Sequence, residues 1–95
     1  MELRADLNAP LEHPCYEGHF PGRPILPGVV LVELIVERIG RGPPRSIPNL
    51  KFQRSLAPGE PFTLRWTVDG DRVAFGCLIG EERVAEGVLE FGEAG

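Results

Sequence analysis

Alternating apolar and polar residues fill most of the second half of the chain. The alternation is clearest in FTLRWTV, residues 62–68, where every second side chain is apolar. A period of two is typical of a strand with one buried face, and DGD and GEE are typical of hairpin turns. A weaker alternation in MELRADLN predicts an opening strand. The later strands are predicted at 50–56, 61–69, 72–80 and 82–91.

The apolar run VVLVELIVERI, residues 29–39, does not alternate. Its valines and isoleucines favour a strand, and a continuous apolar run fits either a buried strand or a buried helix. The length of the run, the stop at Gly40 and the cation Arg38 near the end favour a helix. A buried helix followed by an antiparallel meander predicts an α+β fold, with a curved sheet of about five strands around a central helix.

Length and composition indicate one soluble globular domain over residues 1–95, with 42% hydrophobic and 25% charged residues. The net charge of −4 argues against nucleic acid as a partner. MELRADLNAP has no apolar stretch, so we expect no signal peptide, and no run is long enough for a membrane span. Cys15 and Cys77 are too few for a disulfide scaffold, which favours a reduced, cytoplasmic setting.

One segment is basic although the chain is acidic. Between residues 38 and 54 there are five cations and no carboxylate. Such a segment is either a solvated surface or a docking patch for an acidic partner. The five residues are Arg38, Arg41, Arg45, Lys51 and Arg54.

Candidate chemistry begins in an irregular, proline-rich stretch that spans residues 9–28. Loops of this length in small domains tend to be functional. His19 lies there in GHFPGRP, where a stiff bend would hold the imidazole in one orientation for proton transfer near neutral pH. The alternative is a histidine that only donates a hydrogen bond to a backbone carbonyl.

Glu33 interrupts the apolar run, with apolar residues on both sides. We expect it to be buried, and desolvation of an unpaired carboxylate favours the protonated form, which can donate a proton. The alternative is a glutamate on the one hydrated stripe of the helix, or one paired with an arginine. Glu37 fits that alternative better than Glu33 does.

Gly28 follows Pro27 where the helix is predicted to begin. The first N–H groups of a helix have no partner within the helix and carry partial positive charge, so they can bind a ligand carbonyl. A glycine there allows close approach of the ligand. Pro–Gly is equally common as helix-start punctuation.

The segment GHFPGRPILPGVVLVELI resembles the active-site segment of the 3-hydroxyacyl-[acyl-carrier-protein] dehydratases, the FabA/FabZ-like group of the hotdog superfamily. Those enzymes carry a His–Phe–Pro–Gly turn, a second Pro–Gly and an acidic helix residue fourteen positions after the histidine. His19 and Glu33 have that separation. LKFQRSLAPGEPFTLRWTV is similar to the strand–Pro–Gly–strand segment of the family.

The resemblance implies a hotdog fold, dimerisation through a continuous sheet and reversible dehydration of a (3R)-3-hydroxyacyl thioester to the trans-2-enoyl thioester. His19 would take the α-proton, Glu33 of the partner subunit would help the hydroxyl leave as water, and the Gly28 amide would hold the carbonyl. No metal or other cofactor is implied, because the substrate is carried on the phosphopantetheine of acyl carrier protein or on CoA. The acyl pocket would include Phe20, Pro27, Val29 and Val32, and the five basic residues would dock the carrier.

Leu34 and Ile35 stand where the family commonly has small residues, so we expect a shortened or redirected acyl pocket. Short members of the group occur in fatty-acid or specialised pathways, including those for aryl polyene pigments. Two alternatives remain open from the sequence: a hotdog thioesterase that activates water with a carboxylate, and a non-catalytic module that binds acyl groups or carriers.

Overall fold

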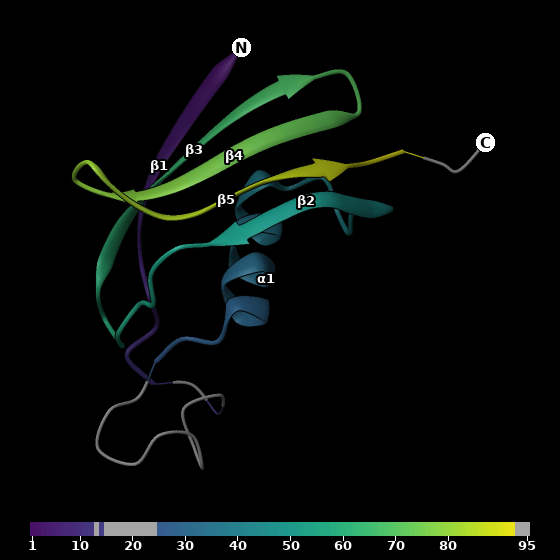
Figure 1. The fold of residues 1–95 in the computed structure, drawn as a ribbon. Coiled ribbons are helices and arrows are strands. Elements are labelled where there is room, and N and C mark those ends of the chain that lie inside the picture. The colour runs from purple at the N-terminus through teal and green to yellow at the C-terminus, as the bar shows by residue number, and fades with distance from the viewer. Residues whose placement is uncertain (13, 15–24, 93–95) are drawn as a thin grey trace.

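The computed structural model describes residues 1–12, 14 and 25–92, which form one sheet and one helix (Figure 1). The five strands are all antiparallel, and their order in the sheet is β1-β3-β4-β5-β2. The predicted α+β architecture is confirmed. The elements are β1 (Glu2–Asn8), α1 (Gly28–Ile39), β2 (Ser46–Phe52), β3 (Pro61–Asp69), β4 (Arg72–Ile79) and β5 (Glu82–Glu90).

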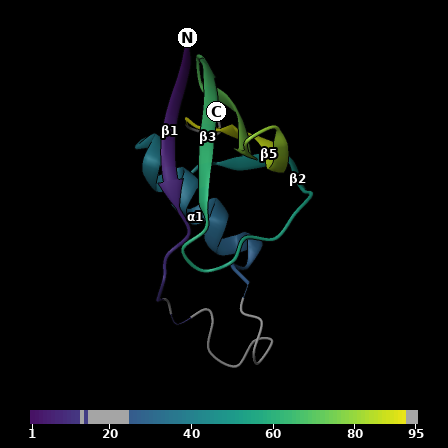
Figure 2. The same ribbon diagram turned by 90° about the vertical axis from the view of Figure 1, so that its left-hand side faces the viewer.

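Helix α1 lies against one face of the sheet (Figures 1 and 2). Its buried residues are Val30, Leu31 and Ile35, which pack with the inward-facing side chains of the strands. Each such side chain contributes about 1.5–3 kcal/mol when it is fully buried. The helix ends at Gly40, whose φ of 78° is the left-handed conformation that favours glycine and whose N–H donates to the Val36 carbonyl.

Strand β2 differs from its prediction. It spans Ser46–Phe52 rather than 50–56, and it includes Pro48, which lies before the predicted strand. Proline is tolerated here because β2 is an edge strand that pairs only with β5, and the register shifts between Ser46 and Asn49. Residues 53–56, which were expected to continue the strand, are irregular.

One edge of β2 is open, and the strand ends at Phe52, close to the helix start. Residues 47–52 are all exposed, and the apolar side chains of Ile47, Leu50 and Phe52 are among them. The Gln53 N–H donates to the Val84 carbonyl at 2.9 Å. In the register of β2 and β5, every second residue before Gln53 points its N–H toward β5 in the same way. Alternation in an antiparallel ladder therefore turns the backbone N–H groups of Leu50 and Phe52 to the open edge.

Candidate active site

Helix α1 begins at Gly28, as the sequence predicts. Pro27 is the N-cap, with φ −60° and ψ 144°, and its carbonyl accepts from the N–H groups of Val30 and Leu31 at 3.1 Å. No side chain caps this end, and within residues 25–92 no acceptor bonds the Gly28 N–H. The amide is therefore a donor at the positive end of the helix dipole.

A cavity of about 570 Å³ opens beside this amide. One wall comes from the start of the helix and includes Pro27 and Val29, two of the predicted acyl-pocket residues. The other wall is residues 52–56, at the end of β2 and just beyond it. Val32 is half-buried and does not line this cavity, and Phe20 lies outside the described residues.

Backbone hydrogen bonds hold the two walls together. The Leu26 N–H donates to the Leu56 carbonyl at 2.8 Å, which ties the residues before the helix to the segment after β2. The N–H groups of Gln53 and Arg54 both donate to the Val84 carbonyl, at 2.9 and 3.2 Å. The cavity beside Gly28 is therefore formed by backbone that is fixed on both sides.

The side chain of Arg54, in the same wall, forms two ion pairs. Its Nη2 lies 2.7 Å from a Glu60 carboxylate oxygen, and its Nε lies 3.1 Å from Glu82. The Ala57 N–H and the Arg54 guanidinium both donate to Glu60 and lower the pKa of its carboxyl, and the hydrogen bond that Arg54 donates to Glu60 raises the pKa of Arg54. Arg54 Nη1 is buried and has no hydrogen-bond partner among the described residues, so these ion pairs satisfy only part of the guanidinium there.

The prediction that Glu33 is buried is wrong for a single chain. Glu33 is exposed, because a helical advance of 100° per residue places it about 160° from both Leu31 and Ile35, which face the sheet. No ion pair or hydrogen bond of Glu33 occurs among the described residues. The carboxylate therefore lies on the hydrated side of the helix, as the alternative interpretation expected.

The five basic residues do not gather into one cluster. Arg45 and Arg54 flank the two ends of β2, a seven-residue strand roughly 23 Å long. Arg45 pairs with Glu90 at 2.9 Å. Arg41 donates to the Gly70 carbonyl at the β3–β4 turn at 2.9 Å. Their role in carrier docking stays a prediction.

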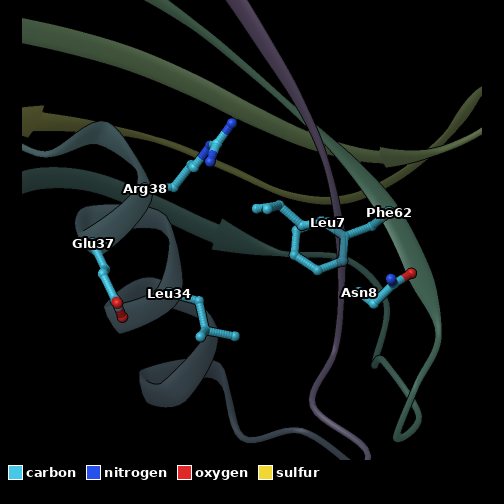
Figure 3. Close-up of a pocket in the computed structure, with 6 residues that line it drawn as sticks. All are labelled: Leu7, Asn8, Leu34, Glu37, Arg38 and Phe62. Carbon is cyan, nitrogen blue, oxygen red and sulfur yellow. The ribbon is translucent and has the colours of Figure 1, made fainter.

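Arg38 and Lys51 are exposed and have no ion pair among residues 25–92. Arg38 lines a separate cavity of about 320 Å³, between the second half of α1 and the ends of β1 and β3. Figure 3 shows Leu34 pointing from the helix toward Leu7 and Phe62 on the two strands. Leu34 therefore lines this second cavity, and Ile35 is fully buried in the core, so neither borders the cavity beside Gly28.

Other chemistry has little support in the part of the chain that the structure describes. It contains no group of three or more residues able to ligate a metal ion, and no helix long and apolar enough to cross a membrane. Cys77 is a free, buried thiol, and burial raises its pKa to about 12, so it is poorly reactive. His19 and Cys15 lie outside the described residues.

Sequence reasoning missed Phe52 as a cavity residue. Its ring lines the wall that faces Gly28, twenty-four positions away in the chain. The sequence placed Phe52 inside a strand but gave no sign of which element that strand would approach.

The fold and the helix-start cavity define the protein class. The sheet and helix are those of hotdog proteins, and the fluoroacetyl-CoA-specific thioesterase FlK has the same fold at a TM-score of 0.64, with 16% identity and coverage of 95% of this chain and 82% of that one. The Xenorhabdus doucetiae dehydratase heterocomplex ApeI:P is more similar, with a TM-score of 0.78, 25% identity and coverage of 94% and 85%.

Sequence comparison specifies the family. The model of the ApeI-like family, described as ApeI dehydratase, matches residues 1–88. A 3-hydroxyacyl-[acyl-carrier-protein] dehydratase FabZ from the Wolbachia of Brugia malayi is 31% identical over 107 residues, which cover 92% of this chain and 73% of that protein. The FabZ of Proteus mirabilis is 36% identical over 84 residues, with coverage of 88% and 51%. The chain belongs to the ApeI-like dehydratase family, and the predicted dehydratase class and hotdog fold are confirmed.

Proposed function

We propose that the chain removes water from a (3R)-3-hydroxyacyl thioester on acyl carrier protein and forms the trans-2-enoyl thioester. The observation that carries this proposal is the Gly28 amide, which no described residue accepts from, beside a cavity of about 570 Å³ in a chain of a dehydratase family. The FabZ relatives are named for this reaction on this carrier. The pathway that we propose is fatty-acid or aryl polyene-like acyl synthesis.

The proposed reaction uses three groups and no metal or redox cofactor. The Gly28 N–H donates to the thioester carbonyl and stabilises the negative charge that develops on its oxygen. His19 takes a proton from C2, the C2–C3 double bond forms, and the C3–O bond breaks. Glu33 gives its proton to the departing hydroxyl, which leaves as water. Hydration of the enoyl thioester is the same sequence reversed.

We infer that Glu33 acts across a dimer interface. It faces away from its own sheet, and Val29, one turn before it, is 67% exposed. The apolar edge of β2 lies beside the same end of the helix, so a second copy could extend the sheet and cover the exposed helix together. The ApeI:P neighbour is a heterocomplex, so a related second chain is the alternative partner to test.

Basic residues near the cavity would meet the acidic carrier. Lys51 and Arg54 lie on either side of Phe52 in sequence, and Phe52 and Arg54 line the cavity. We therefore expect Lys51→Glu to raise KM for carrier-linked substrates and to leave KM for pantetheine-linked substrates unchanged. An equal effect on both substrates would remove Lys51 from the docking surface.

The experiment that tests the reaction is hydration of crotonyl and longer enoyl thioesters, followed by loss of the conjugated-thioester absorbance. We expect the absorbance to fall without release of free thiol. Thiol release with the enoyl group intact would instead indicate the thioesterase. Neither change, with carrier-linked and pantetheine-linked substrates, would contradict a catalytic role.

A further inference from the structure

The ring of Phe52 rests against the first residue of the helix. A Cβ atom built on Gly28 would lie 2.6 Å from Phe52 Cζ, 2.9 Å from Cε2 and 3.0 Å from Cε1. These distances are far below van der Waals contact, so the tip of the ring occupies the space that a side chain at this position would take. A side chain at position 28 would therefore require the ring of Phe52 to shift.

Hydrogen bonds fix the backbone that carries this ring. Phe52 is the last residue of β2 and pairs with Ala85 of β5. The next two N–H groups, of Gln53 and Arg54, both donate to the Val84 carbonyl. The strand is therefore anchored on both sides of Phe52, which fixes the backbone from which the ring extends toward Gly28.

Part of the ring faces the cavity. Phe52 is 47% exposed, and it lines the same cavity of about 570 Å³ as Gly28. A thioester carbonyl that accepts from the Gly28 N–H would place its oxygen about 2.9 Å from that nitrogen. The carbonyl carbon and C2 of the acyl group then lie within a few bond lengths of the backbone on which the ring rests.

We propose that Phe52 determines specificity by excluding acyl groups that carry a substituent at C2. This inference rests on the proposed function, because it requires the carbonyl to bind at Gly28. A 2-methyl-3-hydroxyacyl thioester retains one hydrogen at C2, so its dehydration is chemically possible and the exclusion is steric. An unbranched acyl group has only hydrogens on C2 and passes the ring.

The test compares dehydration of 3-hydroxybutanoyl and 2-methyl-3-hydroxybutanoyl pantetheine thioesters by the wild-type protein, Phe52→Leu and Phe52→Ala. One methyl group in an apolar pocket changes kcat/KM by about 10- to 200-fold. We expect the ratio of kcat/KM for the branched substrate over the unbranched one to rise by that order in Phe52→Ala and by less in Phe52→Leu. Ile47→Ala, which shortens another exposed apolar side chain of β2, should leave the ratio unchanged.

The outcomes separate this inference from the proposed function. Turnover of the unbranched substrate with a ratio that stays the same in both Phe52 variants would overturn the inference and leave the proposed function intact. An equal loss on both substrates would also overturn it, because the ring would then serve only to hold the helix start. No turnover of either substrate by the wild-type protein would instead contradict the proposed function. Phe52→Leu keeps the test open if Phe52→Ala does not fold.

Discussion

Replacing Glu33 with glutamine separates a chemical role from a structural one. The side chain is exposed in the single chain and makes no ion pair or hydrogen bond with any described residue, so its replacement removes no such contact within that chain. Exposed substitutions of this kind change the free energy of unfolding by no more than about 0.5 kcal/mol. A positioned general acid contributes about 10²- to 10⁴-fold to the rate, which is roughly 3–5 kcal/mol in activation free energy.

We therefore expect Glu33→Gln to lose most of its kcat for enoyl hydration while its urea unfolding midpoint stays at the wild-type value. The matched control is Glu37→Gln, one turn further along α1 and also exposed, which should keep both properties. Wild-type kcat in Glu33→Gln would refute the assigned role. Equal losses in the two variants would show that the helix surface needs negative charge rather than an acid at position 33.

Three further results are expected. Leu50→Pro removes an N–H that faces the open edge of β2, so the proposed dimer should dissociate on light scattering while the monomer stays folded; a dimer of unchanged mass would place the interface elsewhere. The pKa of Glu60 is lowered in the fold, so its carboxylate stabilises the fold fully above the ordinary pKa of 4.5, and this stabilisation is lost as the pH falls through the lowered pKa. The free energy of unfolding in urea should therefore fall more steeply with acid in the wild-type protein than in Glu60→Gln. Parallel curves for the two proteins would contradict this. With its pKa raised to about 12, Cys77 in a Cys15→Ser background should react with iodoacetamide at pH 8 only after unfolding, and rapid labelling of the folded protein would show that the thiol is accessible.

The sequence was sufficient for features that depend on local chemistry. The alternation in residues 62–68 predicted β3, and the DGD and GEE turns place glycines with a φ of 61° at the ends of β3 and β4. The apolar run predicted the helix, and Pro27–Gly28 predicted its first residue.

Features that depend on distant contacts were not predictable in this way. The predicted bounds of β2 were wrong because proline is excluded only from strands that are paired on both sides, and no local pattern shows which strand will be an edge. The approach of Phe52 to Gly28 depends on how the helix lies on the sheet. Glu33 was expected in the core because its neighbours in sequence are apolar. In a helix, however, neighbours in sequence point in different directions, so a residue between apolar residues can still face away from the sheet.

The most direct measurement of the central claim is complementation between two inactive variants. His19→Ala and Glu33→Gln chains, carrying different affinity tags, would be mixed under reversible unfolding, and the heterodimer would be purified and assayed for enoyl hydration. A site that takes the histidine from one chain and the glutamate from the other is intact once in that heterodimer, so we predict about half the activity of the wild-type dimer. A purified heterodimer as inactive as either parent would contradict a site shared between two chains.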